Sequence, residues 1–451
     1  MSDRLDRAPW RPIHRRIAAA LGIGWALDAF EVQIIGSVIP AIAATFSLSH
    51  TEQVLVFVVW FAGLGVGAAL FGYLADRVGR RRLFIATLLL YSVSALATAA
   101  SPSYGVFMLF RFFTGLGVGG EYSAVCSAIS EFMPARGRGR TNALVMNFWA
   151  LGGIAAGLVG IVFVSAVLGT NGWRVALLFG VISALYGLYA RRLVPESPRW
   201  LASQGRLEEA NAVIEQVSGI ARARAEYLPV ELQTSLRSQL AELWHTHRGP
   251  LLFGMALDFS EASGYYGLFT FVSVFVLTRG VVNVPAGTVP YYYLVANFGA
   301  LAGGMAASSA LDRIGRRPTL VVGYGAASLS SLLVAAAAIS GSPAWTLAAF
   351  TLAVLCATTA WVSAYPTFTE LFPTHLRATG VGASVAVGRI GAIVGAVVLA
   401  QAAADFGLWS AFATLAGLWG IGALAAAIWW VRGVETRGMT LEAITERLAR
   451  S

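Results

Sequence analysis

Long apolar stretches separated by short polar segments repeat along the whole chain. Breaks at charged residues, prolines and Gly/Ser clusters divide them into twelve segments, over residues 17–44, 52–75, 83–100, 104–130, 141–167, 173–193, 250–278, 289–311, 319–339, 344–368, 378–402 and 408–431. Segments of this length can cross the ~30 Å hydrocarbon core of a bilayer. Because lipid offers no partner to backbone N–H and C=O groups, such segments must be helices. The pattern therefore predicts an all-α membrane protein with twelve transmembrane helices.

Composition and charge support this prediction and suggest an orientation. Only 12% of the residues are charged and 57% are apolar, whereas soluble domains are roughly 25% charged. The net charge of +9 does not indicate nucleic-acid binding, because the basic residues lie in short loops between apolar segments. All of them except Arg111, Arg174, Arg279 and Arg389 fall on one side of the topology, which the positive-inside rule makes cytoplasmic. We expect a multi-pass protein of a bacterial inner membrane with both termini in the cytoplasm.

Three stretches recur later in the chain, in the same order and topological position. Asp28-Ala-Phe-Glu31 matches Asp258-Phe-Ser-Glu261, Asp76-Arg-Val-Gly-Arg80 matches Asp312-Arg-Ile-Gly-Arg316, and Glu131-Phe-Met-Pro134 with Arg138 matches Glu370-Leu-Phe-Pro373 with Arg377. Halves repeated in the same orientation are an architecture of secondary transporters. We expect two pseudo-symmetric six-helix halves over residues 1–193 and 250–431. We also expect a cytoplasmic linker over 194–249, whose short amphipathic helices include one over 206–217, and a cytoplasmic tail over 432–451.

The repeated loop resembles a motif of a known superfamily. Gly72-Tyr-Leu-Ala-Asp76-Arg-Val-Gly-Arg-Arg-Arg82 is similar to the loop 2–3 motif of the major facilitator superfamily, and the second copy has Ser308 in place of the leading glycine. Three further stretches, Glu131–Gly139, Pro195–Leu201 and Val434–Gly438, resemble gating motifs of sugar porters and their relatives. The resemblance covers the whole chain. It implies a binding site between the halves that opens alternately to the two sides of the membrane.

Two other motifs resemble branches of the superfamily that carry organic acids. Asp28-Ala-Phe-Glu31-x4-Gly36-x3-Pro40 is similar to the Asp-Gly-Phe-Asp-x4-Gly-x3-Pro motif of aromatic-acid:proton symporters, with Ala29 for glycine and Glu31 for aspartate. Gly388-Arg389-Ile-Gly391 resembles the organic-ion and synaptic-vesicle-protein-like branch, which includes bacterial nicotinate transporters. The two resemblances together favour a metabolite:proton symporter of a small organic acid over a sugar transporter.

Charged residues within the predicted helices are candidates for function, because each costs at least ~2.5–3.5 kcal/mol at mid-bilayer. They are Asp28, Glu31, Arg111, Glu121, Asp258, Glu261 and Arg389. No histidine falls in a predicted helix, so proton coupling would use carboxylates. At ~1.5 Å per residue, Asp28, Glu31 and Arg111 reach similar depths. We expect them to couple transport to protons; the alternative is a fixed salt bridge that orients two helices.

Arg389 is the best candidate for substrate binding, because a guanidinium matches a carboxylate with two parallel hydrogen bonds. Its partner could instead be Asp258 or Glu261, which would make it structural. Aromatic side chains could line a cavity for a flat ligand, although most aromatic residues in a bundle pack or face lipid. The full set of substrate candidates is Arg389, Phe30, Gln33, Trp149, Asp258, Glu261, Tyr265, Tyr266, Trp361 and Tyr365.

Acid and arginine side chains at cytoplasmic helix ends, repeated in both halves, predict a gate that locks when ion pairs form. The candidates are Asp76, Arg80, Glu121, Glu131, Arg138, Asp312, Arg316, Glu370 and Arg377. The alternative is that the arginines only anchor loops. Glycines of the fourth helix, among them Gly115 and Gly119, follow no strand, so they predict close helix packing and not a nucleotide loop.

We therefore expect proton-coupled uptake of a small aromatic carboxylate by alternating access. The proton gradient is the energy source, no cofactor is needed, and the protein works as a monomer. Proton-driven efflux and sugar uptake are the alternatives within transport, and a transporter-like receptor is the alternative outside it. An enzyme is disfavoured, because the predicted helices offer no metal constellation and no nucleophile–base pair. The cysteines, Cys126 and Cys356, make no case for a disulfide framework or a metal site.

Overall fold

The computed structural model describes all residues except 1–4, 6–7, 135–137, 168–170, 191–192, 221–234, 278–280, 283, 374–375, 440 and 450–451. Some side chains within helices also lie outside the description, among them those of Asp76, Arg80, Glu121, Glu131 and Arg138. The described residues form helices joined by short turns, without a strand. The predicted all-α fold is confirmed.

The N-terminal half contains α2 (Pro12–Phe46), α3 (His50–Val78), α4 (Arg80–Ala99), α5 (Tyr104–Phe132), α6 (Arg138–Met146), α7 (Phe148–Gly160), the π-helical turn η1 (Ile161–Val167), α8 (Gly172–Leu178) and α9 (Gly180–Ala190). The fifth membrane crossing consists of α6, α7 and η1, and the sixth consists of α8 and α9. The segment that follows contains α10 (Pro198–Ser203), α11 (Leu207–Ser218) and α12 (Leu236–Thr246). The amphipathic helix predicted over 206–217 coincides with α11, which buries Ala210, Ile214 and Val217 on one face.

The C-terminal half contains α13 (Arg248–Phe271) with the π-helical turn η3 (Val272–Val276), the short 3₁₀ turn η4 (Ala286–Thr288), α14 (Val289–Arg313), α15 (Arg316–Ile339), α16 (Pro343–Glu370), α17 (Arg377–Phe406) and α18 (Leu408–Arg432). A last helix, α19 (Leu441–Ala449), follows the bundle. Nine helices of the described chain are long and apolar enough to cross a membrane, and two shorter apolar helices lie in α5 and α8–α9. With α13, which carries Asp258 and Glu261, they make up the twelve transmembrane helices of two six-helix halves.

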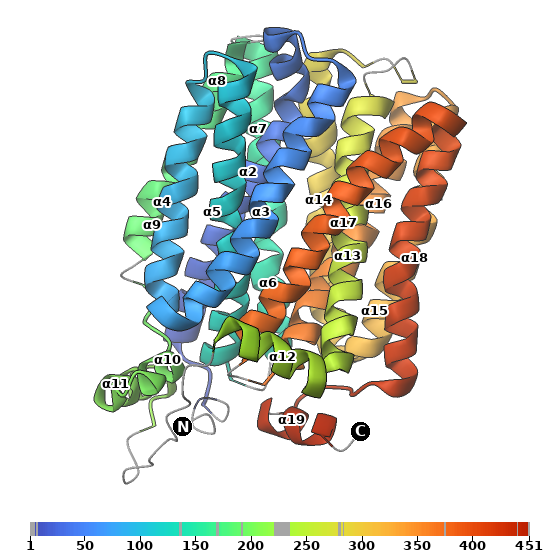
Figure 1. Cartoon of the computed structure of the whole chain (residues 1–451). Coiled ribbons are helices and arrows are strands. Elements are labelled where there is room, and N and C mark those ends of the chain that lie inside the picture. Colours follow the sequence, from blue (N-terminus) through green and yellow to red (C-terminus); the bar gives the residue numbers. More distant parts are fainter. Residues whose placement is uncertain are drawn as a thin grey trace.

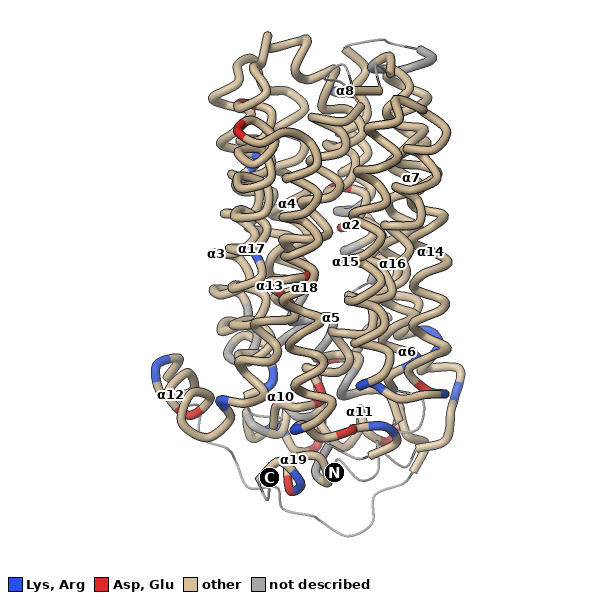
Figure 2. Tube along the Cα trace, turned by 90° about the vertical axis from the view of Figure 1, so that its right-hand side faces the viewer, with Lys and Arg blue, Asp and Glu red and all other residues tan. Residues whose placement is uncertain are grey.

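Both chain termini lie at one end of the bundle, together with α10, α11, α12 and α19 (Figure 1). We call this end the terminal face and the opposite end, near α8, the far face. Figure 2 shows most charged residues gathered at the terminal face, with few along the middle of the helices. This distribution matches the arginine asymmetry of the sequence, which is the basis for proposing a cytoplasmic terminal face.

The helices α3 and α5 pack so closely that only glycines fit between them. A Cβ at Gly63 or Gly67 of α3 would collide with the carbonyl oxygens of Phe112 and Leu116. A Cβ at Gly115 or Gly119 of α5 would collide with the carbonyls of α3 in return. This is the close approach predicted from the glycines of the fourth helix, and it fixes α5, with Arg111, against α3.

The two halves contact each other along the length of the bundle. In the middle, α2 and α7 pack on α14, and α3 packs on α17. Near the far face, the ring of His50 stacks on Phe275 of η3 with 6.2 Å between ring centroids. Near the terminal face, the side chain of Arg316 of α15 extends to Gly139 of α6 in the other half. A Cβ added at Gly139 would collide with Arg316 Nη2. Residues at mid-depth on this interface are therefore enclosed between contacts at both ends.

Candidate functional site

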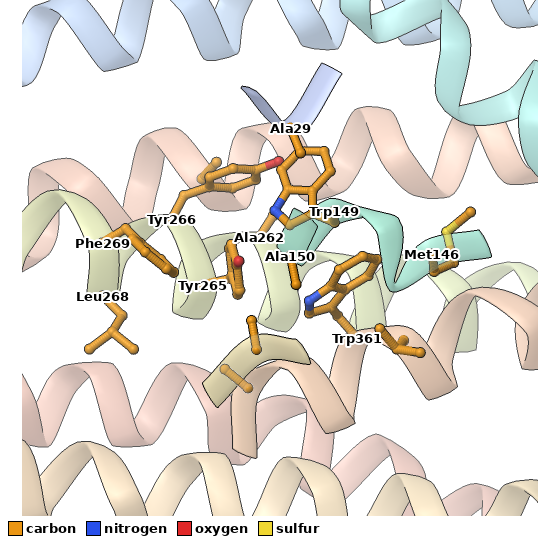
Figure 3. Packing of buried hydrophobic residues seen from close by; sticks show 14 of the residues in the cluster. Ala29, Met146, Trp149, Ala150, Ala262, Tyr265, Tyr266, Leu268, Phe269 and Trp361 are labelled. Atoms are coloured by element: carbon orange, nitrogen blue, oxygen red, sulfur yellow. The ribbon is translucent and has the colours of Figure 1, made fainter. Parts of the chain in front are cut away.

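An aromatic cluster brings together side chains of α7, α13 and α16, from both halves (Figure 3). Trp149 of α7 and Trp361 of α16 approach with 6.0 Å between ring centroids and 74° between ring planes. Tyr265 of α13 packs edge-on against Trp361 at 6.3 Å, and Tyr266 crosses to Phe61 of α3 at 4.8 Å. All of these rings except that of Phe61 were predicted to bind substrate, and the structure brings them together. These five side chains are at most 5% exposed, so the cluster is buried between the halves.

Phe30, also predicted to line the site, lies elsewhere. Its ring packs against Phe179, next to α8, with 6.4 Å between centroids. Both rings belong to the N-terminal half, so this contact is part of the packing of that half. Because Phe30 is one residue before Glu31 on α2, its side chain points about 100° away from that acid.

Glu31 and Arg111 form an ion pair inside the N-terminal half. Arg111 Nη1 donates to Glu31 Oε1 at 3.0 Å, and both side chains are only 1% exposed. The guanidinium also lies over the ring of Trp60, with 5.7 Å from Cζ to the ring centroid. Asp28 is buried one helical turn before Glu31. The sequence predicted Asp28 and Glu31 together as partners of Arg111, and the structure places Glu31 in that position.

Arg389 lies at the interface between the halves and gathers several candidate residues around it. Its Nη2 donates to the Tyr365 hydroxyl at 3.2 Å and lies 3.8 Å from Asp258 Oδ2. Its Cζ lies 5.3 Å from the centroid of the Tyr266 ring. Gly65 of α3, in the other half, lies against the aliphatic part of the Arg389 side chain. A Cβ added at Gly65 would lie 3.1 Å from Arg389 Cβ. Arg389 is thus a buried cation with an aromatic face beside it.

Asp258 can approach Arg389 only because the neighbouring residue on α17 is a glycine. A Cβ at Gly388 would collide with the Asp258 carboxylate. Glu261 lies one turn further along α13 and is also buried; its Oε2 has no hydrogen-bond partner among the described residues. The geometry therefore supports the alternative that Arg389 pairs with an acid of the second half, and that acid is Asp258.

Two amide side chains join the halves beside the aromatic cluster, and only one was predicted. Asn297 of α14 donates through Nδ2 to Gln33 Oε1 of α2 at 2.8 Å, and also to the Tyr293 carbonyl. Gln33 Nε2 and Asn297 Oδ1 are buried without a hydrogen-bond partner in the described chain. Both atoms crowd the position that a Cβ would take at Gly153. The interface therefore holds one donor, Gln33 Nε2, and one acceptor, Asn297 Oδ1, that have no hydrogen-bond partner in the described chain.

A second amide crosses the interface nearer the terminal face. Asn147, at the junction of α6 and α7, donates from Nδ2 to the Leu301 carbonyl of α14 at 3.1 Å. The sequence offered only one signal for Asn147 and Asn297, a polar side chain inside an apolar segment. That signal does not reveal that the two residues face the other half.

The gate residues of the C-terminal half form a connected network at the terminal face. Arg316 Nη2 lies 3.2 Å from Glu370 Oε1, and the Thr436 hydroxyl donates to Glu370 Oε2 at 2.6 Å. The Glu435 carboxylate accepts from the backbone N–H groups of Arg316 and Arg317, at 3.2 Å each. An acid at the start of α15 is stabilised by the free N–H groups and the dipole of that helix. The stretch Val434–Gly438, singled out in the sequence, therefore contacts this network directly.

Arg377 caps a different helix. Its Nε donates to the Thr369 carbonyl at 3.3 Å and its Nη2 to the Phe372 carbonyl at 3.0 Å, at the end of α16. Asp312 lies in the last turn of α14, and its charge interacts with that of Arg316. The side chains of Asp76, Arg80, Glu121, Glu131 and Arg138 lie outside the described residues. Their predicted gating roles stay predictions.

Glycine conformation repeats between the halves at this face. Gly79 before α4 and Gly315 before α15 have φ of +98° and +99°, values that favour glycine. A Cβ at Gly79 would lie 2.9 Å from Glu196 Oε2, and one at Gly315 would lie 3.0 Å from Glu435 Oε2. In each half, an acid that follows the sixth membrane crossing lies against the turn that follows the second crossing. The acid is Glu196 in the first half and Glu435 in the second. This correspondence was not apparent from the sequence repeats alone.

We expect Glu370→Gln to open the terminal face, because it removes the carboxylate that the buried Arg316 guanidinium contacts directly, and this guanidinium packs against Gly139 of the other half. Breaking one side of a buried pair costs about 3–5 kcal/mol, more than the ~1.4 kcal/mol needed for a tenfold population change. Spin labels at Arg140 of α6 and Arg313 of α14, both exposed, would report the distance between halves in a background with Cys126 and Cys356 replaced by serine. We expect a longer distance population at least about tenfold larger.

The matched control for this measurement is Glu209→Gln. Glu209 pairs with Arg206 on α11, but the two side chains are 57% and 43% exposed. Exposed pairs contribute about 0–1 kcal/mol, so the distance distribution should not change. An unchanged distribution in Glu370→Gln as well would remove the gate from the proposed mechanism and leave Arg316 as a structural residue.

Comparisons with known proteins place the chain in a family. The model of the sugar (and other) transporter family matches residues 18–448. The niacin transporter NiaP of Acinetobacter baylyi is 30% identical over 450 residues, 98% of this chain and 99% of that protein. A Bacillus subtilis protein named for niacin and nicotinamide transport is 30% identical, covering 86% and 89% of the two chains.

Solved structures support the same fold. The structure of the proton:xylose symporter XylE, with bound 6-bromo-6-deoxy-D-glucose, has a TM-score of 0.77 at 19% identity and covers 96% of this chain and 99% of that one. The chain therefore is a multi-pass membrane transporter with a small-molecule substrate. It belongs to the sugar (and other) transporter family of the major facilitator superfamily. The prediction that it is not an enzyme is confirmed by these relatives.

Proposed function

We propose that this transporter takes up a small aromatic carboxylate together with a proton, by alternating access between the halves. The observation that carries the proposal is Arg389, a buried guanidinium at the interface, flanked by the ring of Tyr266 and the hydroxyl of Tyr365. A buried cation with aromatic neighbours suits an anion on a flat ring. The relatives named for niacin transport, niacin being a pyridine carboxylate, support the same class of substrate.

In this proposal the substrate carboxylate competes with Asp258 for Arg389. The 3.8 Å between Arg389 Nη2 and Asp258 Oδ2 is longer than the ~2.7–2.9 Å of a charge-assisted hydrogen bond. A carboxylate at the shorter distance would interact more strongly than Asp258 does. The ring of the substrate would lie against Tyr265 and Trp361, and a ring nitrogen or hydroxyl would bond to Gln33 Nε2 or Asn297 Oδ1.

Proton coupling is assigned to the first half. Glu31 is bonded to Arg111 in this conformation, and an acid beside a cation favours its ionised form. If α2 shifts against α5 within the N-terminal half during transport, so that Glu31 leaves Arg111 and enters a drier environment, the acid would take up a proton. The proton gradient then supplies the energy and no cofactor is required. We further propose a cytoplasmic terminal face and a functional monomer.

The experiment that tests this proposal is uptake into proteoliposomes with an inward proton gradient. Labelled nicotinate, benzoate and hydroxybenzoate would be compared with labelled xylose. Uptake of an acid that depends on the gradient and is inhibited by the other acids supports the proposal. Gradient-driven uptake of xylose alone would replace it with sugar symport. Acid movement out of the vesicles under the same gradient would replace it with efflux.

A further inference from the structure

A pocket of about 550 Å³ lies at the terminal face, away from the interface between the halves. The end of α12, the start of α13, the end of α18 and the helix α19 enclose it. Figure 1 shows α12 lying across the lower ends of the C-terminal half, with α19 beneath it. The pocket thus joins the linker, two membrane-crossing helices and the tail. The proposed transport mechanism does not use it.

The side of the pocket toward the membrane is apolar. Leu252 and Ala256 of α13 and Ala425 and Ile428 of α18 line it, and Leu252 and Ile428 are 44% and 52% exposed. Exposed apolar side chains on membrane-crossing helices face lipid, so the pocket continues into the space that acyl chains occupy. Its floor is the ring pair of Phe253 and Trp429, stacked with 4.4 Å between centroids.

The side of the pocket toward water is polar and basic. Arg432, at the end of α18, and His247 line it, and none of its lining residues is acidic. Gly249 contributes the start of α13, a 24-residue helix whose positive dipole end favours an anion and where the N–H groups of Arg248 and Gly249 precede Pro250. A Cβ at Gly249 would meet nothing within 4 Å, so a ligand can approach the backbone. Arg248, beside it, is exposed and lies over the ring of Trp244.

Two exposed tryptophans place this pocket at the membrane boundary. Trp244 of α12 and Trp430 of α18 are each 45% exposed, and tryptophan concentrates where headgroups meet hydrocarbon. A second pocket, of about 430 Å³, lies between α15 and α16 toward the far face and serves as a contrast. Its lining, from Leu333 and Ala336 to Trp345 and Leu352, contains no charged residue. Basic charge therefore distinguishes the terminal-face pocket from an ordinary lipid-filled groove.

We propose that the terminal-face pocket binds one anionic phospholipid, with its phosphate between Arg432 and the start of α13. Its acyl chains lie along Leu252 and Ile428. Basic pockets between helices at this depth suit anionic headgroups. A bound lipid would bridge α12 and α19 to the C-terminal half. This inference does not depend on the transported substrate or on proton coupling.

The test uses the full chain, purified in detergent and freed of lipid. Phosphatidylglycerol, phosphatidylcholine and inorganic phosphate are titrated separately, and bound lipid is counted by native mass spectrometry. We expect phosphatidylglycerol to bind and to raise the unfolding temperature, as any ligand of the folded state does. Arg432→Gln should weaken this binding about fivefold, the contribution of one arginine near a membrane surface. Ala256→Phe should weaken it without changing any charge, because the larger side chain fills the apolar side of the pocket.

The matched control is Arg16→Gln. Arg16 is exposed near the start of α2, the counterpart of α13 in the first half, and it lines neither pocket described above. Unchanged binding in this variant, with loss in the other two, supports the site. Equal binding of phosphatidylcholine, or an equal loss in Arg16→Gln, would show a general lipid coat and overturn the proposal. Displacement of the lipid by millimolar inorganic phosphate would assign the pocket to a soluble anion, and full retention in Ala256→Phe would place the lipid elsewhere.

Discussion

Replacing Glu31 by glutamine is expected to abolish gradient-driven accumulation of the substrate while preserving its exchange across the membrane. The amide keeps an oxygen that can accept the hydrogen bond of Arg111, which spans 3.0 Å to Glu31 Oε1, but it cannot bind or release a proton. A pH difference of one unit is worth about 1.4 kcal/mol per proton, or tenfold accumulation of a monoanion carried with one proton. We expect about tenfold accumulation by the unmodified protein and a ratio near one for Glu31→Gln.

Both quantities are measured in the same proteoliposomes. Accumulation is followed under an inward gradient of one pH unit, and exchange is followed with substrate on both sides and no gradient. Glu208→Gln is the matched control, because Glu208 is an exposed acid on α11 far along the chain from the site. Tenfold accumulation by Glu31→Gln together with its loss in Asp28→Asn would move the coupling proton to Asp28. Accumulation by both variants would exclude the first helix from coupling.

The membrane architecture could be predicted from the sequence because hydrocarbon imposes the same requirements on every crossing helix. Length and apolar content are set segment by segment, so each helix can be recognised without knowing its neighbours. Close packing could be predicted for the same local reason, since Gly115 and Gly119 lie one turn apart on one helix face. The amphipathic pattern over 206–217 likewise needed only its own residues to predict α11.

Contacts between distant segments could not be predicted in the same way. Asp28 and Glu31 lie three residues apart, on one face of α2 and within one turn of depth, so the sequence could not choose between them as the partner of Arg111. Packing sets the rotation of α2 about its axis relative to α5, and this rotation places Glu31 in hydrogen-bonding contact with Arg111. Asn297 meets Gln33 across the interface for a similar reason. Glu435 reaches α15 from beyond the last crossing, a path that no local pattern encodes.

Replacing Arg389 by alanine is expected to weaken binding of the proposed acid substrate by at least about 30-fold. Removing one partner of a buried, hydrogen-bonded charge pair costs about 2–5 kcal/mol, and 2 kcal/mol corresponds to that factor. The same variant should bind the uncharged amide of the substrate, for example nicotinamide in place of nicotinate, within about threefold of the unmodified protein. Lysine at this position keeps the charge but loses the planar fork, so its effect should be intermediate. Affinities of purified protein for acid and amide, measured by calorimetry, provide the comparison.

A competing role for Arg389 is to neutralise Asp258, whose Oδ2 lies 3.8 Å from Arg389 Nη2. In that case Arg389→Ala would harm the site because a buried acid is left uncompensated, and removing the acid as well would restore the affinity. The double variant Arg389→Ala, Asp258→Asn separates the two roles, since coupling between neighbouring residues is measured by such a cycle. If Arg389 contacts the substrate, the double variant still binds the acid weakly, because the missing guanidinium is what the carboxylate requires. Recovery of acid binding in the double variant would instead assign Arg389 to the internal ion pair, and the substrate carboxylate would need another cation.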